Sequence, residues 1–116
     1  MGAGKVGSTL AAYLSQEDHD ITIIDNDEDV IQQINDTLDV MYIKGPGAAP
    51  SVLREAGAKE ADLVLATTNM DEVNMLCALT AKRLGAKYTI ARIRDVAYTE
   101  DLASLQKDLA IDAVIN

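Results

Sequence analysis

Three glycines at G-x-G-x-x-G spacing open the chain and run directly into an apolar helical pattern. They are Gly2, Gly4 and Gly7, and the pattern predicts a helix over residues 5–16. In such a turn the first glycine permits a tight bend, the second lets the backbone approach a pyrophosphate, and the third lets the helix pack closely on a sheet. Free N–H groups and the positive end of the helix dipole would face the anion. The turn favours a dinucleotide-type α/β fold, and a glycine-rich turn without a ligand is the alternative.

Short strand-like runs, β-branched at residues 21–24, alternate with helical patterns along the rest of the chain. The expected strands cover residues 21–24, 40–43, 63–66, 88–91 and 111–115. The expected helices cover residues 27–34, 50–56, 71–84 and 102–109. Strands and helices that alternate through short loops form βαβ units with right-handed crossovers. We therefore predict an α/β fold with a Rossmann-like, doubly wound parallel sheet.

The first, central strand of that sheet is missing, because only Met1 stands before Gly2. In a Rossmann sheet this strand lies between the two halves. We expect its absence to leave a gap there, unless another segment fills the position. The longest helix, over residues 71–84, is expected to end at Gly85 and to share one apolar face among Val73, Leu76, Cys77, Thr80 and Leu84.

Composition limits the function classes. A chain of 116 residues that is 48% hydrophobic suits one domain with its own core. A net charge of -9 argues against binding to nucleic acid or to an anionic membrane surface. A single cysteine, Cys77, excludes an internal disulfide, and its place on an apolar helix face predicts a buried, inert thiol. No apolar run approaches the roughly 20 residues of a membrane span, and no signal peptide is visible. We expect a soluble, intracellular domain.

Asp25 supplies the second half of the dinucleotide argument. It ends the first visible strand, 18 positions after Gly7, near the spacing of a ribose-binding acid. A carboxylate there accepts hydrogen bonds from both ribose hydroxyls and repels a 2′-phosphate. Asn26, which we also place in the site, and Asp27 follow with no Arg, so NAD(H) is favoured over NADP(H). A strand-end Asp that caps the next helix is the alternative.

Four further residues are candidate ligand contacts, each with a structural alternative. Lys5 lies inside the glycine turn, where its ammonium could reach the phosphates or remain solvated. Thr67 and Thr68 follow a strand at its carboxyl end, the edge where open α/β sheets bind ligands. Capping of the next helix by Thr68, Asn69 or Asp71 is their alternative. Arg92 also ends a strand and could bind a phosphate, a partner chain or a neighbouring carboxylate.

No catalytic or metal site is expected. No His and carboxylate stand together at strand ends, and no Tyr has Lys four residues on. His19 falls at the edge opposite to the ligand edge. The acidic run Asp25, Asp27, Glu28 and Asp29 is typical of a solvated helix start. A cofactor-binding half-domain of an NAD-dependent oxidoreductase shares the fingerprint and stays open as the alternative, although the chain offers no general acid or base.

Several longer stretches carry a family likeness. They are 2–7 (GAGKVG), 19–25 (HDITIID), 52–57 (VLREAG), 61–64 (ADLV), 67–74 (TTNMDEVN) and 90–94 (IARIR). On these the chain resembles the nucleotide-binding domains of regulators of potassium conductance, the RCK or KTN domains, especially those of potassium-uptake regulators. The likeness covers almost the whole chain.

The resemblance implies a regulatory sensor rather than an enzyme. Such domains bind NAD(H) or adenine nucleotides (ATP, ADP or AMP), pair as homodimers or larger rings, and report ligand state to a membrane-embedded potassium transporter or channel. The expected location is the cytoplasm, at the inner face of the membrane through that partner. By match of position, the phosphates would lie on Gly2, Gly4, Lys5, Val6 and Gly7, and the ribose on Asp25. Thr67, Thr68 and Arg92 would be secondary contacts.

Two departures from the family pattern accompany the missing strand. Residues 45–48 (GPGA) replace a more polar Gly-Asp/Asn-x-Thr/Ser pattern beside the adenosine. The chain also stops at Asn116, before the crossover helix and C-terminal domain that the family usually has. We therefore expect residues 1–116 to be one N-terminal RCK domain, truncated at both ends.

Overall fold

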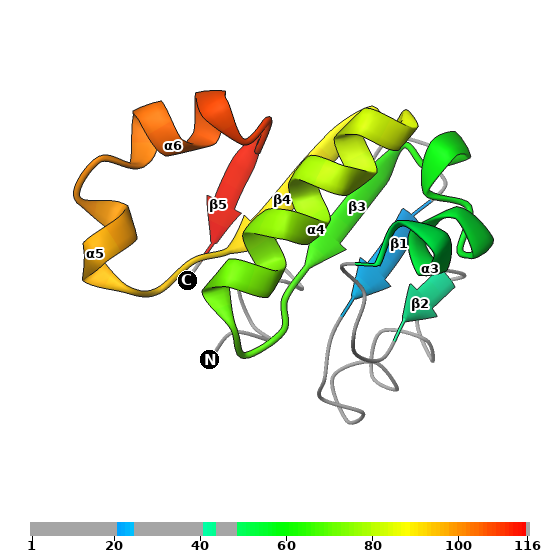
Figure 1. The fold of residues 1–116 in the computed structure, drawn as a ribbon, viewed down its shortest axis with the longest axis horizontal. Coiled ribbons are helices and arrows are strands. Elements are labelled where there is room, and N and C mark those ends of the chain that lie inside the picture. Colours follow the sequence, from blue (N-terminus) through cyan, green and yellow to red (C-terminus); the bar gives the residue numbers. More distant parts are fainter. Residues whose placement is uncertain (1–20, 25–40, 44–48, 116) are drawn as a thin grey trace.

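The computed structural model describes residues 21–24, 41–43 and 49–115, with side chains described for the last of these ranges. Five parallel strands form one sheet in the order β2-β1-β3-β4-β5 (Figure 1). The strands are β1 (Ile21–Ile24), β2 (Met41–Ile43), β3 (Leu63–Ala66), β4 (Tyr88–Arg92) and β5 (Ala113–Ile115). All five predicted strands are present within two residues of the expected bounds, and the α/β fold class is confirmed.

The sheet closes where we expected a gap. β1 pairs directly with β3 in parallel, with Thr22 opposite Val64 and Ile23 opposite Leu65. Two facing strand edges left apart would leave a row of backbone N–H and C=O groups unpaired, and pairing satisfies them. The chain moves outward from β1 to β2 and then returns across β1 to β3. The switch point of this sheet therefore lies between β1 and β3, and ligands of open α/β sheets bind beyond the carboxyl ends of such strands.

The described helices follow the predicted ones closely. They are α3 (Pro50–Glu55), a 3-10 turn (Ala58–Glu60), α4 (Asp71–Leu84), α5 (Val96–Thr99) and α6 (Leu102–Asp108). The bounds of α4 are those expected, whereas the 3-10 turn and α5 were not predicted, because segments of three or four residues are too short to show a period. The helices predicted over 5–16 and 27–34 lie outside the described residues. Among the described helices, none has the length and apolar character needed to cross a membrane.

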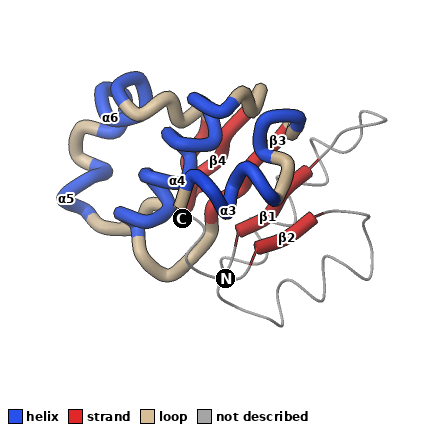
Figure 2. The backbone as a smooth tube through the Cα atoms, turned by 45° about the vertical axis from the view of Figure 1, so that its right-hand side comes forward, coloured by secondary structure: helices blue, strands red, loops and turns tan. Residues whose placement is uncertain are grey.

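Helices α3 and α4 lie over the same face of the sheet, as two views 45° apart show (Figures 1 and 2). Leu53 of α3 packs there with Val64 of β3 and with Cys77 and Ala81 of α4. A second cluster joins α4 to β4 and α6, and contains Met75, Ala78, Ala91, Ile93 and Ile111, with partly buried Leu102 and Leu105 against it. All four residues of β3 are buried, so both faces of the sheet are covered at its centre.

The buried face of α4 differs from the prediction. Asn74, Cys77, Ala78 and Ala81 are fully buried, whereas Leu76, expected on the buried face, is 51% exposed. Small side chains at these positions let the helix approach the strands closely, which a leucine would prevent. The expected inward position of Leu76 is therefore wrong, and that of Cys77 is confirmed.

Two glycines adopt positive φ at the ends of helices, as expected of Gly57 and Gly85. Gly57 follows α3 with φ 80° and ψ 26°, close to the ordinary left-handed conformation. Gly85 caps α4 with φ 123°, and a Cβ there would stand 3.0 Å from the backbone oxygen of Lys59. Gly85 is thus required both for its backbone angle and for its close approach to Lys59.

We expect Gly85→Ala to lower the free energy of unfolding by about 2 kcal/mol, because strained backbone adds to the contact with a main-chain oxygen. Gly57→Ala is the matched control, since its Cβ would meet only the tip of Glu60 at 4.0 Å. That control should cost about 1 kcal/mol. Urea unfolding followed by circular dichroism measures both. Equal losses would contradict the role given to the Lys59 contact.

Candidate functional site

The carboxyl edge of the sheet gathers the polar side chains that the sequence predicted there. Thr67 and Thr68 follow β3 directly, and Arg92 is the last residue of β4, its neighbour in the sheet. Thr67 and Thr68 are buried, with 1% and 2% of their surface exposed, and Arg92 is half-buried. The carboxyl ends of neighbouring parallel strands lie at the same edge of a sheet. Thr67, Thr68 and Arg92 are therefore close together because β3 and β4 are parallel neighbours.

An amide side chain from α4 joins the two strand ends. The Oδ1 atom of Asn74 accepts hydrogen bonds from the backbone N–H of Thr68 at 2.8 Å and from its hydroxyl at 2.6 Å. The Nδ2 atom of Asn74 donates to the carbonyl oxygens of Thr68 at 2.9 Å and of Arg92 at 2.8 Å. Asn74 is therefore the link between the loop after β3 and the end of β4.

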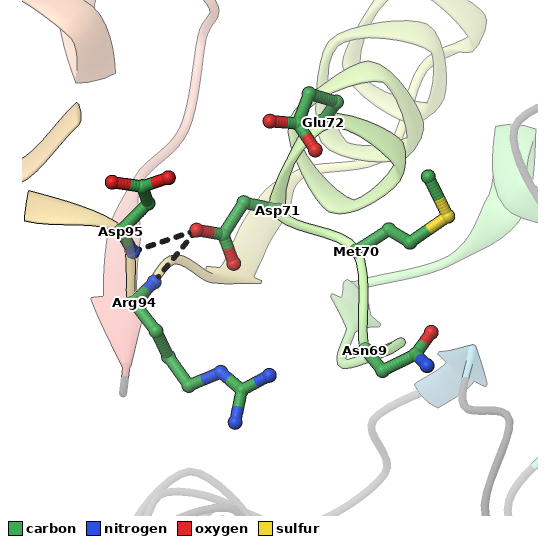
Figure 3. Close-up of a pocket in the computed structure, with 6 residues that line it drawn as sticks. All are labelled: Asn69, Met70, Asp71, Glu72, Arg94 and Asp95. Atoms are coloured by element: carbon green, nitrogen blue, oxygen red, sulfur yellow. Dashed lines mark hydrogen bonds between the residues drawn. The ribbon is translucent and has the colours of Figure 1, made fainter. Parts of the chain in front are cut away.

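The first turn of α4 also holds the segment that follows β4. One carboxylate oxygen of Asp71 accepts hydrogen bonds from the backbone N–H groups of Arg94 at 3.0 Å and Asp95 at 2.7 Å (Figure 3). Asp95 in turn caps α5, because its carboxylate accepts from the N–H of Ala97 at 2.9 Å. The path of the chain from β4 into α5 is thus set by carboxylates.

A third contact ties α5 to α4. The Tyr98 hydroxyl donates a 2.6 Å hydrogen bond to the Glu72 carboxylate. This bond is the main cause that raises the pKa of Tyr98 above its usual value, because it favours the protonated phenol, and the negative charge of Glu72 acts in the same direction. The contact is present in the protonated state and is lost as pH rises through the raised pKa.

An open pocket of about 420 Å³ lies between these segments at the carboxyl edge. Asn69, Met70, Asp71 and Glu72 line one side, and Arg94 and Asp95 line the other (Figure 3). The Arg94 guanidinium points away from the carboxylates of Asp71 and Asp95 in this view. The carboxylates of Asp71, Glu72 and Asp95 all accept the internal hydrogen bonds described above. The exposed guanidinium of Arg94 is the positively charged group of this pocket.

Arg92 carries an unmet donor at this edge. Its Nε atom is buried and has no hydrogen-bond partner among the described residues. Most buried polar atoms in proteins have such a partner, because an unpaired one costs free energy. A buried guanidinium nitrogen beside a ligand edge is the chemistry expected where an anionic or polar ligand group binds.

The other predicted contacts lie outside the described residues. They are Gly2, Gly4, Lys5, Val6, Gly7, Asp25 and Asn26. Met70 is the N-cap residue of α4 and Asp71 bonds the loop after β4, so the helix-capping alternative is wrong for Asp71. The Thr68 hydroxyl accepts a 3.3 Å hydrogen bond from the N–H of Met70 at the start of that helix. The alternative role of Arg92 was a bond to a neighbouring carboxylate. Among the described residues, no carboxylate bonds its Nε atom.

Sequence reasoning missed Asn74 and the outward bonds of Asp71. Both belong to the stretch 67–74, and they lie three positions apart on one side of α4. A polar residue that shares a helix face with small apolar residues is the signal for such a buried bond. The signal was missed because the sequence prediction placed Leu76, and not Asn74, on the buried face of α4. The prediction of a buried Cys77 is confirmed, and burial raises the pKa of its thiol to about 12. A thiol so protonated is a poor nucleophile.

Comparisons with known proteins agree over nearly the whole chain. Residues 1–116 match the TrkA-N domain family. The chain is 46% identical over 99 residues to the Trk system potassium uptake protein TrkA of Halomonas elongata and 41% identical over 112 residues to that of Vibrio alginolyticus. These matches cover 84% and 96% of this chain but only 22% and 24% of the two relatives. The chain spans about a quarter of their length.

Solved structures show the same fold. The RCK domain of GsuK aligns with a TM-score of 0.64 and 23% identity, covering 93% of this chain and 28% of that one. A structure described as the GsuK channel bound to NAD aligns with a TM-score of 0.60 and 18% identity, covering 95% of this chain and 19% of that one. Family match, relatives and fold agree, and the chain belongs to the TrkA-N family.

Proposed function

We propose that this chain is a regulatory nucleotide-binding module of a potassium transport system and that it binds NAD(H) at the carboxyl edge of its sheet. Membership of the TrkA-N family supports the link to potassium uptake, because the relatives carry that name. The NAD-bound state of a channel with the same fold supports the ligand class. The module acts as a sensor and carries out no reaction of its own.

The observation that carries the proposal is the pair of strand ends at the described edge. Thr67 and Thr68 stand beside Arg92, whose buried Nε atom has no partner among the described residues. The switch point between β1 and β3 lies at the same edge, and Asp25 follows β1 directly in the sequence. A dinucleotide would thus meet ribose-binding, hydroxyl and guanidinium groups along one line of strand ends.

Within this proposal the glycine turn, with Gly2, Gly4, Val6 and Gly7, holds the diphosphate, and Lys5 adds a positive charge. Asp25 and Asn26 face the ribose. ATP, ADP and AMP share the adenosine and phosphate that these groups bind, so they are competing ligands in the test. The module pairs with a second copy, as a dimer or within a ring, and acts at the cytoplasmic face of the membrane on an embedded potassium transporter or channel. Ligand binding changes that assembly through different affinities for two arrangements.

Calorimetric titration of the full-length natural chain with NADH, NAD, ATP and AMP tests the ligand. We expect Asp25→Ala to weaken each adenosine ligand about tenfold or more, because two hydrogen bonds to a carboxylate are lost. Lys5→Ala should weaken ligands with two or more phosphates and leave AMP nearly unchanged, since its charge acts on the phosphates.

Asp29→Ala is the control, because it removes the same charge from a helix start expected to be solvated. It should leave every dissociation constant within about twofold. Absence of binding by the unmodified chain would overturn the proposed function. Equal losses across the ligand series would overturn only the role of Lys5. Turnover of NAD with an alcohol or hydroxy acid would favour the oxidoreductase alternative.

A further inference from the structure

We propose that Asn74 is a positioning residue for the nucleotide site, holding the Thr67-Thr68 loop and the Arg92 strand end in the arrangement that receives the ligand. The inference rests on the proposed function. In this proposal Asn74 does not touch the ligand itself; it acts through the two segments that it joins.

The side chain of Asn74 has no spare hydrogen-bonding capacity. A carboxamide offers two donors and two acceptor lone pairs, and Asn74 uses all four. It binds Thr68 three times, through the N–H, the hydroxyl and the carbonyl oxygen, and Arg92 once, through the carbonyl oxygen. Since donors and acceptors both go to fixed partners, the amide holds these two segments in one relative position.

These bonds lie where the sheet stops holding the strands together. The ladder between β3 and β4 ends at the pair Ala66 and Ala91, one residue before Thr67 and Arg92. Beyond this pair β3 continues into the loop before α4, and β4 continues into the segment toward α5. The Nδ2 atom of Asn74 bridges the carbonyl oxygens of Thr68 and Arg92 beyond that last pair. It thus replaces the ladder at the edge where the ligand groups stand.

Because Asn74 is buried, its amide group must find hydrogen-bond partners within the protein. Asn74 is 0% exposed, and its neighbours on the same helix face are Cys77, Ala78 and Ala81. An apolar side chain would fill such a place with no polar group to satisfy, whereas a buried amide is tolerated only when it is fully bonded. A fully satisfied buried polar network specifies one local geometry, which is what a preformed binding edge needs.

Arg92 is the charged residue that this bridge helps to place at the ligand edge. Its buried Nε atom has no partner among the described residues. None of the described hydrogen bonds therefore fixes the side chain at that atom, so the backbone at residue 92 is the described part of Arg92 that is held in place. That backbone is held by β5, because Arg92 pairs with Ile115, and by Asn74 on the side of the ligand edge.

A double-mutant cycle tests the inference through affinity for NADH. Asn74→Asp keeps the shape of the side chain but removes both donors, so it faces two carbonyl oxygens with a carboxylate. We expect the dissociation constant for NADH to rise about tenfold, the equivalent of one hydrogen bond to the ligand. In an Arg92→Ala background the same change should cost less than about threefold, because the guanidinium is already gone and only the Thr67-Thr68 loop is still affected.

Thr89→Val is the matched control for general destabilisation. Thr89 is also 0% exposed, and its hydroxyl donates a 2.7 Å bond to the carbonyl oxygen of Ala110 near the opposite end of β4. Its removal should lower stability while the dissociation constant stays within about twofold and adds independently to the effect of Arg92→Ala. All measurements use the full-length natural chain at a temperature where circular dichroism shows each variant folded.

The outcomes separate the two proposals. If the unmodified chain binds NADH and Asn74→Asp binds equally well, the positioning role is overturned and the proposed function stands. Fully additive losses in the cycle would also overturn it. If the unmodified chain does not bind, both proposals fall. Should Asn74→Asp not fold, Asn74→Ser, which is smaller and places one hydroxyl in the same space, takes its place with the same expected non-additivity.

Discussion

Leu53→Ala is expected to lower the free energy of unfolding by about 3 to 4 kcal/mol, the largest loss among the substitutions considered. Leu53 is 0% exposed and is the largest side chain in its cluster, where five of the other buried residues are alanines. Such short neighbours cannot move in to fill the space, so most of the leucine volume would remain as a cavity. Urea unfolding followed by circular dichroism measures the loss.

Leu76→Ala is the matched control, because it removes the same atoms from a leucine that is 51% exposed. We expect a change within about 0.5 kcal/mol, since little apolar surface is lost and alanine favours the helix. A comparable loss in both variants would show that Leu76 is buried in solution, as the sequence pattern had suggested.

The contrast between these leucines marks what sequence could and could not predict. Strands such as 63–66 and the full length of α4 follow from local pattern, because short apolar runs and a long helical period are properties of neighbouring residues. The rotation of α4 about its axis is not local. It depends on how closely the helix approaches the sheet, and here Ala78 and Ala81 permit an approach that Leu76 would prevent.

The site divides in the same way. Thr67, Thr68 and Arg92 were predicted at one edge, because the ends of parallel strands meet wherever the strand order allows. The bonds that hold this edge in place were not predicted, since Asn74 reaches Arg92 across 18 residues of sequence and Asp71 reaches Asp95 across 24. The direct pairing of β1 with β3 was also missed, because it depends on which strand edges remain available and not on either strand alone.

Asp71→Ala is the second large expected effect, a loss of about 3 kcal/mol in the free energy of unfolding. Asp71 is 8% exposed, and one of its carboxylate oxygens accepts hydrogen bonds from both Arg94 and Asp95. Without it, two backbone N–H groups lose an ionised acceptor and the first turn of α4 loses a favourable negative charge. Hydrogen exchange should show faster exchange at those two amides, while the amide of Thr89 near the opposite end of β4 keeps its protection relative to global unfolding.

Asp71→Asn separates geometry from charge, because its amide oxygen can still accept from both N–H groups. We expect it to cost about 1 kcal/mol and to preserve most of the protection at Arg94 and Asp95. If Asn and Ala were equally damaging, the charge at the start of α4 would be the main contribution and the bonds to the loop a minor one. If neither variant changed exchange at those amides, the loop would be held by the remaining contact between Tyr98 and Glu72. We expect the free energy of unfolding to fall much further for Asp71→Ala than for Asp71→Asn, which should be close to the unmodified chain. This order follows only if Asp71 fixes the path from β4 into α5, and with it the side of the pocket that carries Arg94.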